Sequence, residues 1–428
     1  MEPLKREVFL KSYIENKEML DERNEKGIEK YRKGDFTLHF DGTGKKKVTV
    51  KQTKHDFLFG STAFMLRSFE VPEKEDIFKK YFTNLFNHAV VPLYWSDLEP
   101  EEGHVRFSED SEYIYRRPPV DTALRFCREN GLEPKGHCLA WHCFVPEWLA
   151  KYSPDERKQI LERRIREIAE AYADKIPSFD IVNESASGYN VGRKRLFECY
   201  DEIGLELGAK YFPNNRKILN ETNRGIWHDY ASEGKYMAFR MQIEEFLRRG
   251  IPFDEIGLQF HMFGKYEAFV NGNDEYLNAV NMVEILDIYN GYNKPMHISE
   301  ITIPSYTGRL PENEAIQAEL TETLYRTWFA TENMKSIVWW NLVDGYAAYA
   351  PLGTEEGENR YGGGLIHFDM TPKPAYEALD KLINHEWKTS FETVTEGSEY
   401  KFRGFFGTYE VTVEDENGKK TETVHFGK

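Results

Sequence analysis

The chain has 428 residues, of which 40% are hydrophobic and 30% charged, a composition typical of a globular protein with ample chain for a large core. Its net charge of −16 disfavours nucleic acid and anionic membrane surfaces as partners, because both would repel it, and a neutral substrate fits better. Four cysteines are too few for a disulfide framework in a chain of this length. No apolar run of 18 residues occurs, and residues 1–7 lack the apolar segment of a signal peptide. We expect a cytoplasmic protein with reduced thiols, or a secreted one if a signal peptide has been removed, and the sequence indicates no protein partner.

The two ends of the chain contain short strand-like segments. Residues 7–34, rich in Glu, Lys and Leu, predict one exposed helix, and the alternation across Asp35–Thr53 predicts a β-hairpin. Residues 400–426 contain similar strand-like segments around an Asn-Gly turn. Because an isolated hairpin is marginally stable in water, we expect the two ends to meet in one small antiparallel β module. The expected units are residues 1–54 (helix and hairpin), 55–388 (a barrel) and 389–428 (a β segment packing with the hairpin).

Between the ends, eight apolar strand-like segments alternate with helical ones. Two of the helical segments, Pro154–Ala173 and Glu312–Thr331, carry apolar side chains on one face. Alternation of this kind predicts an α/β fold, the (β/α)8 TIM barrel, whose active residues lie at the carboxyl ends of its strands. The expected strands are Asp56–Thr62, Asn87–Trp95, Glu133–Trp141, Ser178–Glu184, Arg216–Thr222, Glu255–Met262, Pro295–Thr302 and Ser336–Asp344.

Two of these strands carry a Glu at the carboxyl end: Glu184 on the fourth and Glu300 on the seventh. Hydrolysis of a glycosidic bond needs one carboxyl group that protonates the leaving oxygen and another that attacks or stabilises the oxocarbenium-like centre. A retaining mechanism requires the two groups to be about 5–5.5 Å apart and to differ in environment. Asn183 could hold a sugar hydroxyl, and His261 could orient a neighbouring carboxylate. The pattern therefore predicts a two-carboxylate site.

Four motifs between about Phe57 and Trp387 each lie at the end of an expected strand. They are Gly136–His142, similar to GHxLxWH; Phe179–Glu184, similar to WDVVNE; Ile256–His261, similar to IGxQxH; and Ile298–Ile301, similar to ITEL. In this order the four motifs resemble those of glycoside hydrolase family 10, the retaining endo-β-1,4-xylanases.

The resemblance implies a glycosidase that degrades xylan or xylo-oligosaccharides by double displacement and needs no cofactor. It implies that Glu184 is the general acid/base and Glu300 the nucleophile. It also implies a set of substrate-binding residues around the reacting sugar: His137, Trp141, Asn183, Gln259, His261 and Trp340.

Three positions depart from the pattern of the family. Its second strand usually ends in Glu-Asn-x-x-Lys-Trp, but here Tyr94 stands where the Lys would be and the Glu-Asn pair is missing. Phe144 replaces a Gln, and the second Trp of strand eight has no counterpart in Ala347–Tyr349. We therefore count Tyr94 and Phe144 as substrate-binding positions with altered chemistry. One alternative is a β-glycosidase for a decorated or non-xylan glycoside, and another is a catalytically silent carbohydrate-binding barrel.

A cluster of His and Cys residues, His137, Cys138, His142 and Cys143, has the composition of a metal site. Consecutive residues of a strand point to opposite faces, so His137 and Cys138 cannot converge on one ion. Zinc sites built from such ligands usually add a second, distant pair, which the sequence does not offer. We therefore expect no metal site.

Overall fold

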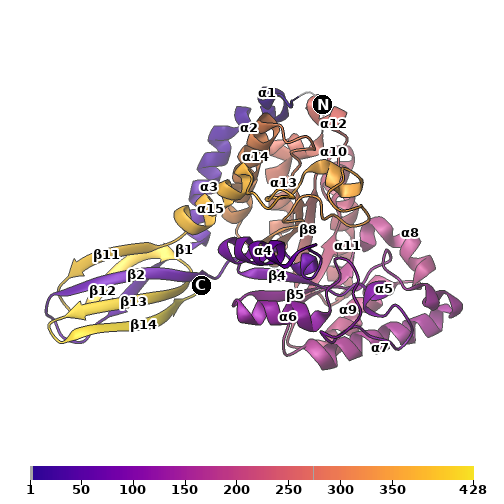
Figure 1. Ribbon diagram of the computed structural model, residues 1–428, viewed down its shortest axis with the longest axis horizontal. Helices are drawn as coiled ribbons and strands as arrows, with labels where there is room; N and C mark the ends of the chain where they lie inside the picture. The colour runs from indigo at the N-terminus through magenta and orange to yellow at the C-terminus, as the bar shows by residue number, and fades with distance from the viewer. Residues whose placement is uncertain (1–2, 273) are drawn as a thin grey trace.

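A computed structural model describes residues 3–272 and 274–428 (Figure 1); residues 1 and 2 of the expected N-terminal unit lie outside this part. Its centre is a closed barrel of eight parallel strands in the order β10-β3-β4-β5-β6-β7-β8-β9. Helices outside and side chains inside bury these strands on both faces, which explains their nearly continuous apolar runs. The expected TIM barrel is confirmed. Its strands are β3 (Leu58–Thr62), β4 (His88–Pro92), β5 (Glu133–Ala140), β6 (Ser178–Asn183), β7 (Arg216–Glu221), β8 (Glu255–His261), β9 (Met296–Thr302) and β10 (Met334–Trp339).

Helices cover the outside of the barrel. The helix that follows β5 starts with a capping box, in which Ser153 and Glu156 exchange side-chain to backbone hydrogen bonds, so its first turn is fixed locally. Both helices expected from their apolar faces are confirmed to within one residue at each end, as α7 and α14. The α-helices after β3 are α4 (Pro72–Leu85), α5 (Trp95–Leu98), α6 (Val120–Glu129), α7 (Pro154–Tyr172), α8 (Ser185–Arg195), α9 (Tyr200–Tyr211), α10 (Trp227–Glu233), α11 (Ala238–Arg249), α12 (Tyr266–Val270), α13 (Ala279–Asn290), α14 (Pro311–Ala330) and α15 (Pro374–Asp380).

The N-terminal segment is not one exposed helix. It forms three consecutive helices, α1 (Arg6–Phe9), α2 (Lys11–Glu15) and α3 (Lys17–Tyr31), which pack on the barrel. Tyr13 is buried and donates its hydroxyl hydrogen bond to the carbonyl of Tyr276 at 2.7 Å. Gly27 lies so close to α14 that a Cβ there would stand 2.3 Å from the carbonyl oxygen of Ala330. This segment has few apolar residues among many charged ones, so its buried face could not be recognised from the sequence.

The β module projects from one side of the barrel (Figure 1), and strands from both ends of the chain form it, as expected. The expected hairpin is wrong, however, because its two strands lie in different sheets. β1 pairs with β12, whereas β2 is a central strand between β11 and β13 and has no free edge for β1. Val48 and Val50 on β2 are fully buried beneath β1, where Phe36 stacks on Phe426 at 4.4 Å between ring centroids. The strands are β1 (Lys33–His39), β2 (Lys46–His55), β11 (Ser390–Thr395), β12 (Glu399–Phe405), β13 (Gly407–Asp415) and β14 (Gly418–Phe426).

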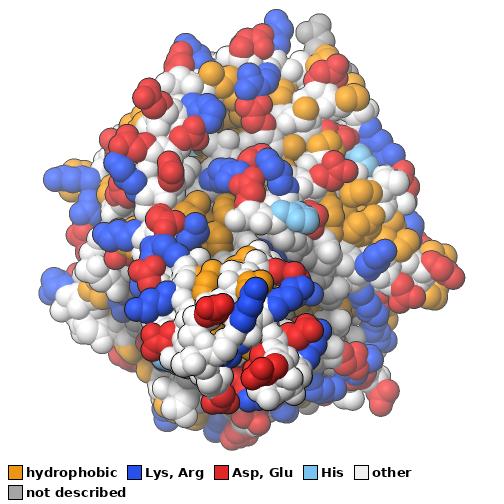
Figure 2. All heavy atoms as spheres, turned by 90° about the vertical axis from the view of Figure 1, so that its left-hand side faces the viewer, with side chains coloured by type: hydrophobic (Ala, Val, Ile, Leu, Met, Phe, Trp, Pro, Cys, Tyr) orange, Lys and Arg blue, Asp and Glu red, His pale blue; other side chains and the backbone are white. Residues whose placement is uncertain are grey.

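The surface around the module carries charges of both signs. Figure 2 shows acidic and basic side chains interspersed over this face, so it presents no single acidic field. Within residues 3–272 and 274–428, the helices are too short or too polar for any of them to cross a membrane.

Candidate active site

The ten expected site residues lie at or just beyond the carboxyl ends of barrel strands. Hydrogen bonds, ion pairs and ring contacts connect nine of them directly, and Asn220 connects Asn183 to Glu300, so the structure brings the whole set together. Their positions are His137 on β5, Asn183 at the end of β6, Gln259 and His261 on β8, and Glu300 on β9; Tyr94, Trp141, Glu184 and Trp340 follow β4, β5, β6 and β10 closely, and Phe144 lies in the loop after β5.

Glu184 occupies the turn between β6 and α8. Its backbone is left-handed (φ 55°, ψ 37°), a costly conformation for a residue with a Cβ and one that the surrounding fold must enforce. Trp141 Nε1 donates to Glu184 Oε2 at 3.1 Å, and Gln259 Nε2 donates to Oε1 at 3.0 Å. Burial and the nearby charge of Glu300 raise the pKa of Glu184 to about 7, against the lowering effect of the two donors. This carboxyl group can therefore keep a proton near neutral pH.

Glu300 is a buried carboxyl group with a different set of partners. His261 Nε2 lies 3.0 Å from Oε2, and Asn220 Nδ2 donates to Oε1 at 3.0 Å. Burial raises the pKa of Glu300 to about 7, and the charges of His137 and Lys135 oppose this rise without cancelling it. The charged surroundings thus differ: His137 and Lys135 oppose the rise in the pKa of Glu300, whereas the charge of Glu300 adds to the rise in the pKa of Glu184. Such a difference between two carboxyl groups is what an acid and a nucleophile require.

A buried ion pair inside the barrel fixes His137. Lys135 Nζ and His137 Nδ1 lie 2.9 and 2.7 Å from the same oxygen of Asp180, and all three side chains are almost fully buried. Burial opposes ionisation of Asp180, but Lys135 and His137 overcome it and lower its pKa to about 2. With Nδ1 held by Asp180, the other ring nitrogen of His137 lies 3.9 Å from Glu300 Oε1. Asp180 therefore fixes the orientation of the His137 ring beside Glu300.

His261 is held in the same way from its other side. Its Nδ1 lies 2.9 Å from Thr302 Oγ1, and burial lowers the pKa of the ring to about 4, so the imidazole is neutral. A neutral ring that donates from Nε2 to Glu300 must accept at Nδ1, so the Thr302 hydroxyl is the donor. Thr302 therefore selects the ring tautomer that faces Glu300 with a proton.

Asn220, on β7, was not expected in the site. It donates to Glu300 Oε1 at 3.0 Å and to Asn183 Oδ1 at 2.7 Å, and its own Oδ1 accepts from Ser299 Oγ at 2.6 Å. A single amide thus connects the ends of β6, β7 and β9.

Glu221, the next residue, is a third buried carboxyl group beside the site. It accepts hydrogen bonds from the backbone N–H groups of Ala186 at 2.8 Å and Thr222 at 3.0 Å. Burial, and then the charge of Glu184, raise the pKa of Glu221 to about 8. A signal for both missed residues existed in the sequence, because Asn220-Glu221 ends an apolar strand with the same amide–acid pair that ends β6.

Aromatic side chains occupy the positions at which the family resemblance implies polar contacts. Tyr94 stacks on Phe144 with 4.3 Å between ring centroids and an interplanar angle of 15°, and Trp141 lies 5.5 Å from Tyr94. The guanidinium of Arg117 covers the Tyr94 ring at 4.2 Å and donates to Asp97 Oδ2 at 2.8 Å. This side of the site is therefore built from packed aromatic rings and from Arg117, which is paired with Asp97.

The sequence model of glycosyl hydrolase family 10 matches residues 50–382. The anti-sigma-I factor RsgI6 of Acetivibrio thermocellus is 26% identical over 374 residues, which cover 84% of this chain and 41% of the relative. Endo-1,4-beta-xylanase 3 of Arabidopsis thaliana is 23% identical over 399 residues, covering 90% and 47%. The chain thus spans less than half the length of each of these relatives.

The crystal structure of xylanase 10B from Thermotoga petrophila RKU-1 in complex with xylobiose matches with a TM-score of 0.60 at 19% identity, over 77% of this chain and 95% of that one. This likeness shows the same barrel fold. Since the family model extends over well more than half of the residues, the chain belongs to glycosyl hydrolase family 10.

Proposed function

We propose that the protein is a retaining glycoside hydrolase that cleaves β-1,4-xylosidic bonds in xylan or xylo-oligosaccharides. Glu300 attacks the anomeric carbon while Glu184 protonates the leaving oxygen, which gives a covalent glycosyl-enzyme. Glu184 then takes a proton from water, and that water releases the sugar with net retention. His137, Asn183, Gln259, His261 and Trp340 surround the reacting sugar.

The observation that carries this proposal is the contrast between the two carboxyl groups. Burial raises the pKa of both groups to about 7, but their partners differ: Glu184 accepts from Trp141 and Gln259, whereas Glu300 contacts Asn220 and His261 and lies near His137. Family membership and the xylanase names of several relatives support xylan as the polymer.

The test is to trap the covalent intermediate. A 2-deoxy-2-fluoro-β-xyloside with a good leaving group should label the enzyme once, and peptide mass spectrometry should place the sugar on Glu300. Glu300→Ala should lower kcat at least about 10³-fold, roughly 4 kcal/mol in the barrier. Label on another residue, or near-normal turnover by the variant, would sink the assignment.

A second candidate function is hydrolysis of a decorated or non-xylan β-glycoside. The stack of Tyr94 on Phe144, covered by Arg117, favours this candidate. A site without polar partners for sugar hydroxyls selects among glycosides differently from a site that has such partners. A panel of aryl β-xylosides, cellobiosides and arabinosides separates the two candidates by kcat/KM. Oligosaccharide binding without cleavage of any of these would instead support a silent carbohydrate-binding barrel.

A further inference from the structure

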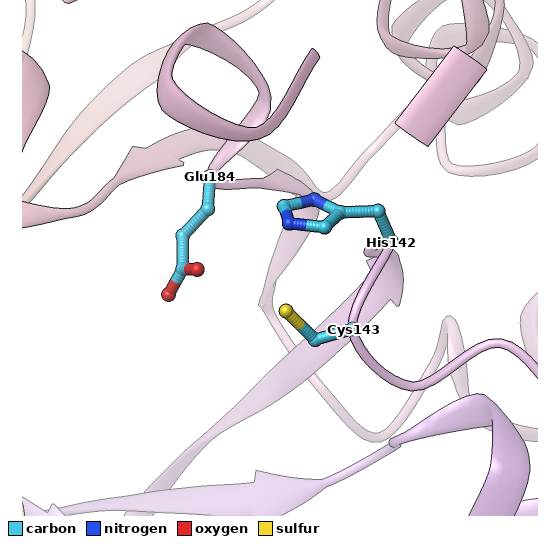
Figure 3. Close-up of side chains that lie close together, drawn as sticks. All are labelled: His142, Cys143 and Glu184. Carbon is cyan, nitrogen blue, oxygen red and sulfur yellow. The ribbon is translucent and has the colours of Figure 1, made fainter. Parts of the chain in front are cut away.

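Two residues with no role in the proposed reaction, His142 and Cys143, lie beside Glu184. One ligand atom from each of the three side chains lies within 4.8 Å of the other two. Figure 3 shows the imidazole of His142 and the thiol of Cys143, both from the loop after β5, directed toward the carboxyl group of Glu184. This group includes Glu184 and leaves out His137 and Cys138, the two residues whose opposite directions disfavoured a metal site in the sequence.

The local fold prepares His142 as a ligand. His142 is 8% exposed, and among the described residues the Nδ1 of its ring has no hydrogen-bond partner. A ring nitrogen without a hydrogen-bond partner is available to coordinate a cation. Gly188 on α8 makes room for His142, because a Cβ there would stand 1.8 Å from the ring.

The loop that carries both residues is tied down. Arg195 Nη1 donates to the carbonyl oxygen of His142 at 2.8 Å and to that of Cys143 at 3.4 Å. The Cys143 side chain itself is exposed and free to rotate toward a ligand. The site therefore combines a fixed backbone, a buried imidazole and an adjustable thiol.

We propose that His142, Cys143 and Glu184 form an inhibitory site for a soft divalent cation, with Zn²⁺ as the probe. Thiolate, imidazole and carboxylate are the ligands that Zn²⁺ prefers, and three protein ligands leave a fourth position for water. Bond lengths of about 2.0–2.3 Å require the ligand atoms to close by roughly 1 Å, a movement available to Cys143. On binding, the sulfur–hydrogen bond breaks, its proton goes to solvent, and a sulfur–zinc bond forms.

Metal binding at this site can be tested separately from its effect on activity. A cation on Glu184 holds it as a carboxylate and removes the proton donor, so inhibition rests on the proposed function. The site itself does not, and it can be measured on an inactive protein.

The experiment uses the 428-residue chain, freed of metal with a chelator. Calorimetric titration with Zn²⁺ should show one site, and Co²⁺ should give the near-ultraviolet charge-transfer band of a thiolate ligand. Cys143→Ser should weaken zinc binding by at least about tenfold, abolish the cobalt band and relieve zinc inhibition of aryl β-xyloside hydrolysis, with its metal-free kcat/KM within about twofold of wild type. Cys199→Ser, a partly buried cysteine outside the cluster, is the matched control and should behave as wild type.

Zinc binding of unchanged affinity in Cys143→Ser, or a cobalt complex without the thiolate band, would overturn the site. Full activity with zinc bound in the wild type would overturn its inhibitory role. A cobalt band in a protein that cleaves none of the glycosides would uphold the metal site and count against the proposed function, so the two failures are distinguishable.

Discussion

Gln259 tunes the proton affinity of the group proposed to act as the acid. It donates to Glu184 Oε1 at 3.0 Å, and Gln259→Met keeps the length of the side chain while removing the donor. A hydrogen bond contributes about 1.5–3 kcal/mol to an ionised partner and about 0.5–1.5 kcal/mol to a neutral one. Losing it therefore disfavours the carboxylate by about 1–1.5 kcal/mol, or about one pKa unit. The pKa of Glu184, about 7 in the wild type, should rise to about 8.

The pH profile of kcat/KM reports this change separately from any general loss of activity, because its alkaline limb follows deprotonation of the acid in the free enzyme. We expect that limb to move up by about one pH unit in Gln259→Met, measured with an aryl β-xyloside. Gln242→Met is a control of the same chemistry, because Gln242 donates to Ser185 and Asp201 and not to Glu184. A limb that stays in place or moves down in Gln259→Met would refute the reasoning.

Three other perturbations test the groups around the site and the module. Asp180→Asn leaves Lys135 buried without its counter-charge and should lower the free energy of unfolding by about 3–5 kcal/mol in urea at pH 7. Because the pKa of Asp180 is lowered from 3.8 to about 2, the stability it contributes is present above pH 4 and lost as pH falls through 2; equal stability of the two proteins at pH 7 would contradict this. Thr302→Val should lower kcat about tenfold by releasing the His261 tautomer, and Thr302→Ser should restore it, whereas a fully active Val variant would show that the hydroxyl has no part. A chain ending at Lys388 loses both neighbours of β2 and should be recovered mainly as aggregate, so a folded yield equal to that of the full chain would argue against the module as a stabilising unit.

The barrel could be predicted because each of its strands is buried and therefore contains a local run of apolar residues. Strand ends were less accurate, since β4 ends at Pro92 and Trp95 already begins α5. The hairpin failed for a different reason: the partners of β2 lie more than 300 residues away, and alternation along one strand does not show which strand it pairs with.

Some residues of the site could likewise be predicted from the sequence, and others could not. Glu184 and Glu300 were accessible to sequence reasoning because both end apolar strands within recognisable motifs. Lys135 and Asp180 were not, because a charged residue within a strand is ordinarily taken to face solvent, and only closure of the barrel brings these two together inside it. The left-handed turn at Glu184 has no local signal either, since no glycine marks it.

Because β2 pairs with strands from the far end of the chain, it stays unpaired during much of protein synthesis. β2 is complete by His55, but β11 begins only at Ser390, so at ~5–20 residues per second the ribosome leaves this strand unpaired for roughly 20–70 s. During that interval Val48 and Val50 have no sheet to cover them. The exposed Lys47, Lys51 and Lys54 on the same strand place positive charges along it, and such charges discourage nascent chains from pairing with one another before the last strands emerge.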